Sequence, residues 1–312
     1  MAHRFLLFKG VLIMEKDCLL SIVTPTYNRA PLLKNCFRSL QRQTNKSFEW
    51  IIIDDGSSDD TRAVVSSFRE QAPEMPITYV YQENGGKHTA LNASHPYLHG
   101  RYVLILDSDD VLLDTAVNDV YEAWLPHENR PEIGVVVLLK GKTPDKPVAF
   151  VRETGVPVDL LKCERVCVSG SDCCEVLRTE LFLKYPFPVF PGEKFISEGV
   201  LWKQINQGYR YVYTNKVVYL CDYLEDGLTR SGRAMRIKSP LGGMLNSSLN
   251  MDPKSSLKTR IKNGLLYCCY GYFAGLNAKE ILNWDRSSRG VKAICLLPGF
   301  LQFLLWKRRY SS

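Results

Sequence analysis

The sequence predicts an α/β fold in which a mainly parallel sheet is flanked by helices. The first reason is that strand-like and helix-like segments alternate through residues 19–124 at the spacing of βαβ units, whose crossovers are right-handed. The second is that the strand-like segments are short, continuous apolar runs, as in strands covered on both faces. The third is that helical apolar stripes replace this pattern towards the end of the chain, which indicates a helical C-terminal extension.

The expected elements follow in a regular order along the first half. We expect strands over residues 19–24, 48–53, 77–81 and 102–106, each followed by a helix, at about 32–40, 58–68, 88–97 and 115–124. The second half is less regular, with a strand over 134–139, a helix near 198–207 and strand-like runs at 209–213 and 216–220. We expect this half to complete the same sheet and to form the other wall of a cleft.

The charge of the chain is distributed unevenly. The formal net charge is +7, but residues 230–312 hold fifteen Lys/Arg against three Asp/Glu, which leaves the remainder near −5. A strongly basic terminal region favours an anionic partner, either a membrane surface or nucleic acid.

The apolar run Ala293–Trp306 favours lipid over nucleic acid as that partner. Its fourteen residues are fewer than the ~20 that an α-helix needs to cross hydrocarbon, and Pro298-Gly299 is expected to break or kink it. Lys307, Arg308 and Arg309 close the run. We therefore predict an anchor that lies on an anionic membrane surface. The alternative is a core helix that packs on the domain.

Cysteine usage indicates a reducing compartment. Ten cysteines occur without CxxC spacing, and Cys163, Cys167, Cys173 and Cys174 fit no zinc pattern. The short apolar run before Met14 is too brief to span a bilayer and shows no convincing secretory signal, and Met14 is a possible true start. We expect reduced thiols and a cytoplasmic location.

Polar, turn-forming residues end each of the four early strands. They are the runs Thr24–Arg29, Asp54–Asp59, Glu83–Lys87 and Asp107–Asp110. The carboxyl ends of parallel strands lie at one edge of a sheet, so the four runs can surround one ligand. An Asp-x-Asp at such an edge can hold a divalent cation that in turn binds phosphate oxygens. The alternative for Asp107–Asp110 alone is a solvated turn that caps the next helix.

The residue types at these strand ends suit a nucleotide. Tyr27 offers a ring face to a base, and a carboxylate can accept a base N–H. Gly85 and Gly86 allow the backbone to approach phosphate, and Lys87 supplies a cation.

Four motifs together resemble glycosyltransferase family 2. They are Ser21–Arg29 (SIVTPTYNR), Ile53–Asp59 (IDDGSSD), Asn84–Asn92 (NGGK followed by ALN) and Leu106–Asp110 (LDSDD). The resemblance is specific over about residues 19–125 and looser to about 225. It implies a Rossmann-like GT-A fold, a nucleotide-sugar donor, Mn²⁺ or Mg²⁺ as cofactor and inversion at the transferred sugar.

This resemblance also defines the expected domains. Residues 1–18 form an N-terminal extension. The GT-A domain covers 19–228, with a nucleotide-binding half (19–125) and an acceptor half (126–228). The basic helical region covers 229–312.

The family pattern further implies roles for individual residues. Thr26 and Tyr27 would line the base, and Asp54 or Asp55 would contact uracil. Asp107 would lie near the ribose, and Asp109, together with Asp107, would bind the metal. The full set implied for the nucleotide sugar is Thr24, Pro25, Thr26, Tyr27, Asn28, Arg29, Asp54, Asp55, Gly86, Lys87, Asn92, Asp107 and Ser108.

The general base implied by the family is Glu198. Family members commonly carry an acidic pair at the start of a helix, before an aromatic residue, and Ser197–Trp202 has one acid at that place. The alternative role for Glu198 is a helix-terminal carboxylate that interacts with the helix dipole.

The expected function is therefore an inverting transfer of sugar from a nucleotide sugar, with a UDP-sugar favoured, to a hydroxyl of a saccharide or lipid-linked acceptor. Such a reaction fits cell-surface polysaccharide synthesis at the inner face of the cytoplasmic membrane, with no nucleic-acid partner. One alternative is a non-catalytic nucleotide- or polysaccharide-binding protein. The other is a sugar-phosphate nucleotidyltransferase, which is disfavoured because no Gly-rich Arg-Lys loop follows the first strand.

Overall fold

The computed structural model describes residues 5–8, 11–14, 18–161, 167–168, 173–221 and 228–310. Its side chains are described in the same ranges except at 5–8, 11–14, 167–168 and 228–231. Cys163 lies outside the described residues, as does the side chain of Cys167. Among the cysteines with described side chains, none forms a disulfide with another.

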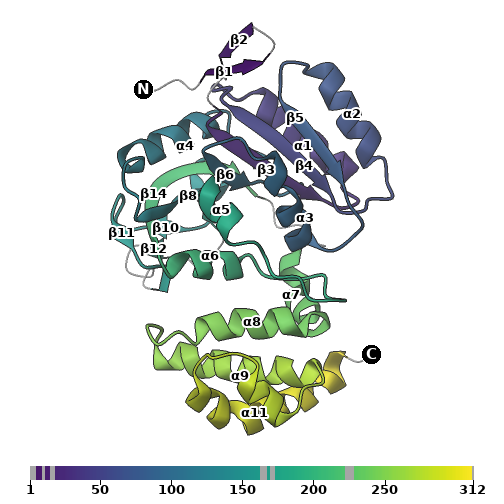
Figure 1. Cartoon of the computed structure of the whole chain (residues 1–312), viewed down its shortest axis with the longest axis vertical. Helices are drawn as coiled ribbons and strands as arrows, with labels where there is room; N and C mark the ends of the chain where they lie inside the picture. Colours follow the sequence, from purple (N-terminus) through teal and green to yellow (C-terminus); the bar gives the residue numbers. More distant parts are fainter. Residues whose placement is uncertain are drawn as a thin grey trace.

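One large sheet forms the centre of the described structure (Figure 1). Its strand order is β11-β14-β8-β13-β6-β3-β4-β5. These strands are β3 (Leu20–Thr26), β4 (Phe48–Asp54), β5 (Ile77–Tyr81), β6 (Tyr102–Ile105), β8 (Ile133–Thr143), β11 (Pro157–Val158), β13 (Cys173–Arg178) and β14 (Arg210–Leu220). The short strands β7 (Val111–Leu112) and β9 (Lys146–Pro147) pair with β14 and β8.

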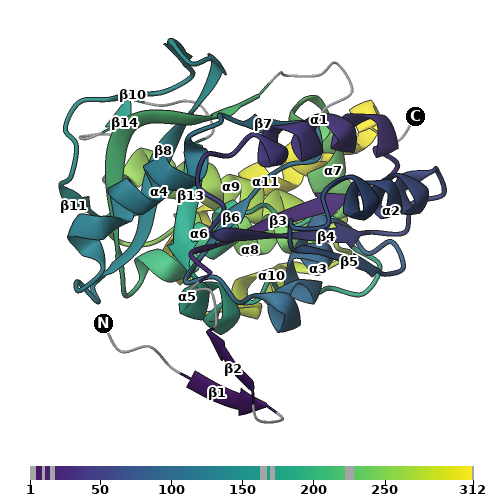
Figure 2. The same cartoon turned by 90° about the horizontal axis from the view of Figure 1, so that it is seen from above.

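Two small antiparallel pairs are not hydrogen-bonded into this sheet. They are β10 (Phe150–Val151) with β12 (Cys167–Val168), and β1 (Phe5–Phe8) with β2 (Val11–Met14). Figures 1 and 2 both show the β1–β2 hairpin standing away from the body of the molecule.

Helices cover both faces of the sheet, because side chains of successive strand residues point to opposite faces. Ile22, Trp50 and Leu104 pack into one core with α1 (Ala30–Gln41), α2 (Thr61–Gln71) and α4 (Ala116–Trp124). The adjacent residues Val23, Ile51 and Val103 pack into a second core with α3 (Lys87–Ala93), α5 (Thr179–Lys184) and α6 (Gly199–Asn206). Single-turn 3₁₀ helices, η1 (His95–Tyr97) and η2 (Leu125–His127), follow α3 and α4.

The α/β class and the GT-A-type arrangement expected from the sequence are confirmed, with two differences in detail. Strands β5, β4, β3 and β6 are parallel, but β13 runs antiparallel between β6 and β8. The two strand-like runs at 209–213 and 216–220 form one strand, β14, whose register shifts between Tyr213 and Val217. The polar residues between the two runs lie in this irregular stretch, which is why the pattern reads as two strands.

The C-terminal region is helical, as expected, and lies below the sheet in Figure 1. It consists of α7 (Leu228–Lys238), α8 (Pro240–Asn250), α9 (Leu257–Phe273), α10 (Ala278–Asn283) and α11 (Arg289–Tyr310). These helices share a third core that includes Met244, Tyr267 and Cys295. Gly264 of α9 faces Val291 and Cys295 of α11, and Gly299 of α11 faces Cys268, so the two helices approach closely.

We expected a break or a kink at Pro298-Gly299, and the break is wrong. Helix α11 continues through Pro298 and is 22 residues long, not the fourteen suggested by the apolar run. Pro298 removes one backbone hydrogen bond from the helix. Gly299 packs against α9, and this packing stabilises the helix around the proline.

Candidate active site

The polar strand ends meet at one edge of the sheet. Because β3, β4, β5 and β6 are adjacent and parallel, the loops that follow them leave the sheet at the same edge. These loops contain residues 27–29, 55–60, 82–86 and 107–110. The second half of the chain contributes α6. The start of this helix lies next to these loops, because Glu198 contacts Lys87 there.

Asn28 ties the loop after β3 to the loop after β4. Its backbone N–H donates to Ser57 Oγ (2.8 Å), and its Oδ1 accepts from the N–H of Ser58 (2.8 Å). Asn28 adopts a φ of 51°, a left-handed conformation that Asn tolerates better than most residues. Beside it, Tyr27 is 50% exposed. The hydroxyl of Thr26 is buried and has no hydrogen-bond partner among the described residues, so a ligand at this edge could satisfy it.

Three other residues predicted to bind the nucleotide sugar lie in β3 or next to α1. Thr24 Oγ1 accepts a hydrogen bond from Trp50 Nε1 (2.9 Å) inside the sheet core. Pro25 is buried in β3, and Arg29 directly precedes α1. Direct contact of Thr24 with a donor stays a prediction.

Asp54 and Asp55 hold the loops of the site in place. Asp54 accepts hydrogen bonds from the N–H of Ser57 (2.8 Å) and the hydroxyl of Tyr79 (2.6 Å). The carboxylate of Asp55 accepts four hydrogen bonds of 2.6 to 3.2 Å, from Gln82, Asn84, Gly85 and Gly86. Both aspartates are buried. In this structure they position the turns, and contact of either one with uracil stays a prediction.

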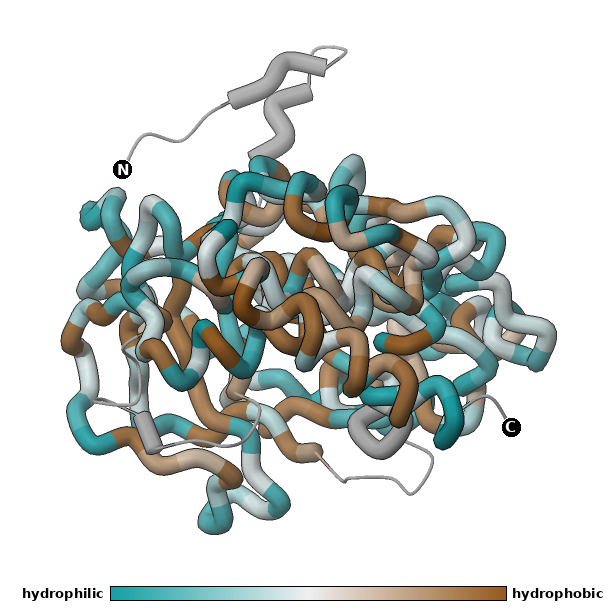
Figure 3. The backbone as a smooth tube through the Cα atoms, turned by 90° about the horizontal axis from the view of Figure 1, so that it is seen from below, coloured by the Kyte–Doolittle hydropathy of each residue, from teal (hydrophilic) through white to brown (hydrophobic). Residues whose placement is uncertain are grey.

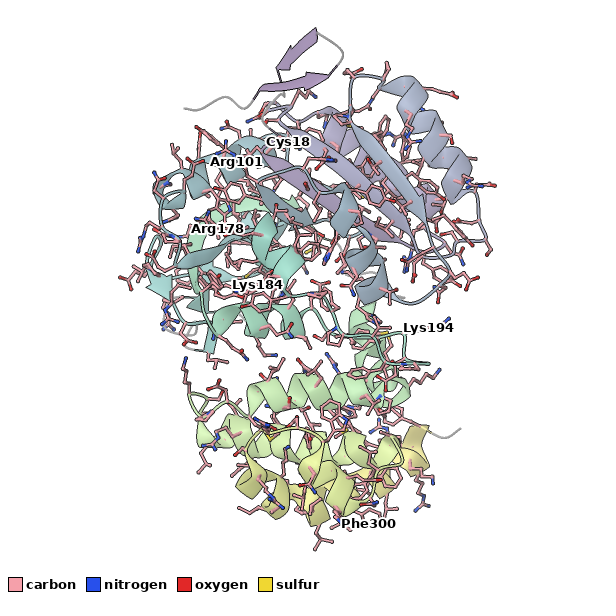
Figure 4. The ribbon with its side chains drawn as sticks, in the orientation of Figure 1. Cys18, Arg101, Arg178, Lys184, Lys194 and Phe300 are labelled. Atoms are coloured by element: carbon pink, nitrogen blue, oxygen red, sulfur yellow. The ribbon has the colours of Figure 1, made fainter. Side chains whose placement is uncertain are left out.

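Glycine is required at position 86. Its φ is +96°, and a Cβ there would lie 2.0 Å from the backbone oxygen of Lys194. Lys194 (labelled in Figure 4) also donates to Asn84 Oδ1 (2.8 Å). The turn before α3 is thereby fixed against the segment that leads to Glu198.

Asn92 makes a second connection between the same two segments. Its Nδ2 donates to the carbonyl of Phe187, and its Oδ1 accepts from the N–H of Phe187, both at 2.8 Å. Both ends of the amide are therefore occupied. Asn92 positions the segment before α6, and a contact with the donor stays a prediction.

Lys87 joins the two halves of the site. Its ammonium forms ion pairs with Asp107, at the end of β6, and with Glu198, whose Oε1 lies 2.5 Å from Lys87 Nζ. The three side chains are 24%, 32% and 31% exposed, so the cluster is partly open to solvent. Burial would lower the pKa of Lys87, but the two carboxylates outweigh it and raise that pKa. Burial would likewise raise the pKa of Asp107, but Lys87 and Lys140 lower it, so Asp107 is charged at neutral pH.

Two side chains that the sequence motifs do not include contact the backbone of the turn at 107–110. The thiol of Cys36 contacts the carbonyl oxygens of Asp107 (3.5 Å), Ser108 (3.4 Å) and Asp110 (2.9 Å). The hydroxyl of Tyr219 accepts a hydrogen bond from the N–H of Asp107 (2.9 Å). Both residues occupy apolar positions of their elements, so their sequence pattern carried no functional signal.

Lys140 is a second cation near the aspartates. Its ammonium lies 4.3 Å from the ring centre of Tyr219. Burial would lower its pKa, but Asp107 and Glu198 outweigh this and raise it. Burial and the nearby Asp107 raise the pKa of Asp110 to about 7. Since β8 runs in the same direction as β6, a lysine directly after its apolar run could have been assigned to this edge.

Asp109 differs from its neighbours because it makes no hydrogen bond or ion pair with another described residue. It is partly exposed at the same turn. No cluster of three or more His, Cys, Asp or Glu side chains suited to a metal occurs among the described residues. The available set is therefore Asp109 with Asp107. One or two carboxylates completed by substrate phosphates and water is a common way to bind Mg²⁺, so these residues fit a divalent ion that arrives with a diphosphate.

Glu198 precedes the first residue of α6, as the sequence predicts. Helix α6 is anchored in the core through Trp202, whose carbonyl accepts a hydrogen bond from Tyr211 (2.6 Å). The nearby Glu193 has a different role, because its carboxylate accepts from the N–H groups of Leu241 (2.7 Å) and Gly242 (2.9 Å) at the start of α8. Of these two acids, Glu198 is the one that contacts Lys87.

Comparisons with known proteins agree with this architecture. A model of the family "Glycosyl transferase family 2" matches residues 21–158. The GalNAc(5)-diNAcBac-PP-undecaprenol beta-1,3-glucosyltransferase of Campylobacter jejuni is 35% identical over 107 residues, which cover 33% of this chain and 33% of that protein. The matches span only about a third of the length of the curated relatives.

Solved structures resemble nearly the whole chain. Residues 1–349 of S. aureus TarS in complex with UDP-GlcNAc superpose with a TM-score of 0.61 at 18% identity, covering 93% of this chain and 92% of that one. The mannosyltransferase PcManGT of Pyrobaculum calidifontis, in complex with GDP-Man and Mn²⁺, gives a TM-score of 0.55 at 18% identity, with 94% and 84% covered. At this identity the likeness establishes the fold.

Proposed function

We propose that this chain, whose residues 21–158 match the model of glycosyltransferase family 2, transfers a sugar from a nucleotide-sugar donor to a hydroxyl of a saccharide or lipid-linked saccharide. The observation that carries this proposal is the pair of contacts made by Lys87. They bring an acid of the nucleotide half, Asp107, and an acid of the other half, Glu198, to one ammonium group. A transferase needs such an arrangement, with diphosphate-binding groups on one side of the reacting carbon and a base on the other.

On the donor side, the chain supplies positive charge and a fixed backbone. Lys87 and Lys140 offset the charge of the aspartates and are placed to attract a diphosphate. The Gly85-Gly86 turn, held by Asp55, lets backbone approach it. Asp107 and Asp109 would hold Mn²⁺ or Mg²⁺, and the ion would supply charge neutralisation for the diphosphate leaving group.

On the acceptor side, Glu198 would accept the proton of the attacking hydroxyl. A single displacement from the face opposite the diphosphate inverts the anomeric centre. In this proposal residues 19–228 form the catalytic domain and residues 229–312 form a helical region beside it, to which Glu193 is tied by its hydrogen bonds with Leu241 and Gly242.

A UDP-sugar is the favoured donor, and a lipid-linked saccharide in cell-surface polysaccharide synthesis is the favoured acceptor. The TarS structure contains UDP-GlcNAc, and the name of the C. jejuni relative includes a polyprenyl diphosphate carrier. Such an acceptor requires the protein to work at the cytoplasmic face of a membrane.

The proposal is tested by incubating the purified protein with a panel of UDP-, GDP- and dTDP-sugars and Mn²⁺ and measuring released nucleoside diphosphate. We expect slow release of UDP from one UDP-sugar by water alone, and faster release once an acceptor is added. Tight UDP binding without release from any sugar would indicate a non-catalytic binding protein. Formation of pyrophosphate from a sugar phosphate and UTP would indicate a nucleotidyltransferase.

A further inference from the structure

Helix α11 presents an apolar surface that nothing in the described structure covers. Half of the large hydrophobic side chains that are exposed among the described residues lie on α9 and α11. On α11 they recur every three or four residues, so they form one stripe along the helix. We define this stripe, with two residues of α9, as the outer face: Leu257, Ile261, Ile294, Leu297, Phe300, Leu301, Leu304 and Leu305.

The outer face points away from the sheet. The buried residues of α11, among them Val291, Cys295 and Gly299, lie on the opposite side of the helix and pack against α9. Figure 4 shows Phe300 at the edge of the helical layer farthest from the sheet. Figure 3, viewed from that side, shows hydrophobic stretches across the middle of the molecule. The β1–β2 hairpin lies at the other end of the molecule in Figure 1 and does not cover this surface.

The charge around the outer face identifies the kind of partner. Helices α9 and α11 together carry eight Lys or Arg and no Asp or Glu. Lys258 and Lys262 are exposed at the start of α9, and Lys307, Arg308 and Arg309 are exposed at the end of α11. Two copies joined through this face would bring like charges together. An anionic lipid surface offers both hydrocarbon for the leucines and negative charge for the basic ends.

Helix α11 is the one described helix that is long and apolar enough to cross a membrane. Its contacts instead fix it along the body. Lys292 is fully buried and pairs with Asp285, with Nζ–Oδ1 at 2.5 Å, while its ammonium lies 4.6 Å from the ring centre of Tyr267. At the other end, Trp306 packs near Tyr270. Crossing the bilayer would separate α11 from α9, and Lys292 would lose its packing against the Tyr267 ring of α9.

We propose that the outer face of α9 and α11 docks the protein on an anionic membrane surface, with α11 lying in the plane of the interface and still packed on α9. The membrane location was put forward above without a defined surface. This proposal assigns it to a surface that includes α9 as well as the C-terminal run. It depends on the packing of these helices and on their charges, and it is independent of which sugar is transferred.

The test measures co-sedimentation of the full chain with vesicles of phosphatidylcholine alone or mixed with phosphatidylglycerol. We expect much stronger binding to the mixed vesicles, weakened by salt. The triple variant Leu297→Gln, Leu301→Gln, Leu305→Gln should lower binding at least about tenfold, because all three side chains are exposed and would enter lipid. Replacing Lys307, Arg308 and Arg309 by Gln should lower binding to mixed vesicles about a hundredfold.

The matched control is the double variant Leu125→Gln, Phe150→Gln, which removes exposed apolar side chains elsewhere and should bind like the wild type. Unchanged thermal unfolding of each variant shows that the fold is intact. If the triple variant bound vesicles as tightly as the wild type, the proposal would be overturned. It would also be overturned if the wild type were a dimer and the triple variant a monomer, because the outer face would then be a dimer interface. Resistance of the cellular protein to extraction by alkaline carbonate would show a spanning helix instead. UDP release measured without vesicles should be the same in the triple variant, so failure of this surface is distinguishable from failure of the proposed activity.

Discussion

Replacing Glu198 by Gln is expected to lower sugar transfer at least about a hundredfold while leaving the affinity for UDP nearly unchanged. Removing a general base typically costs about 10²–10⁴ in rate, or ~3–5 kcal/mol of barrier. Gln keeps the size of the side chain, and Lys87 keeps Asp107 as its ion-pair partner. The donor side of the cleft should therefore stay in place. Slow hydrolysis of the donor by water can survive, because a water molecule need not contact Glu198 as the acceptor does.

The two quantities are measured separately, as the transfer rate under saturating donor and as UDP affinity by calorimetry. The matched control is Glu70→Gln, an exposed carboxylate on α2 that should behave as the wild type. Transfer by Glu198→Gln at near the wild-type rate would place the base elsewhere. Glu193 is a poor substitute because it caps α8.

Replacing Asp109 by Ala is expected to abolish turnover without unfolding the protein. Asp109 makes no hydrogen bond or ion pair with other described residues, so its loss leaves no buried partner unsatisfied. Its proposed role is to hold the divalent ion with Asp107. The same loss of turnover is expected for the wild type in excess EDTA, and Mn²⁺ or Mg²⁺ should restore the wild type only.

Thermal unfolding and UDP release are the readouts for this variant, and Asp145→Ala serves as the control. Asp145 is exposed, and its carboxylate accepts a hydrogen bond from the hydroxyl of Thr143 (2.7 Å). If Asp109→Ala retained full activity, or if the wild type worked in EDTA, the metal assignment would fail. A large drop in the unfolding temperature would instead assign Asp109 a structural role.

The fold of residues 19–125 could be predicted from the sequence because its signals are local. Each strand is a continuous apolar run that ends in polar residues, and parallel pairing places those ends at one edge. The contact of Lys87 with Glu198 could not be predicted, because it depends on how residues more than a hundred positions apart fold together. The supporting roles of Cys36 and Tyr219 were missed for a related reason, since both look like ordinary core residues in sequence.

For the C-terminal helices, the sequence predicted the helices but not how they pack. Their apolar pattern revealed helices, but the pattern of α11 alone does not show which face is buried. That face is set by the small residues Gly264 and Gly299 and by the pair of Lys292 with Asp285. The rule that proline ends a helix also failed at Pro298, because tertiary packing compensated for one missing hydrogen bond.

The measurement that tests the proposed mechanism most directly is the configuration of the sugar first released from the favoured UDP-sugar, followed by proton NMR before the anomers equilibrate. A single displacement across the cleft between the Asp107 side and Glu198 predicts the anomer opposite to that of the donor. Release of the same anomer, or no release of sugar from any donor, would contradict the account.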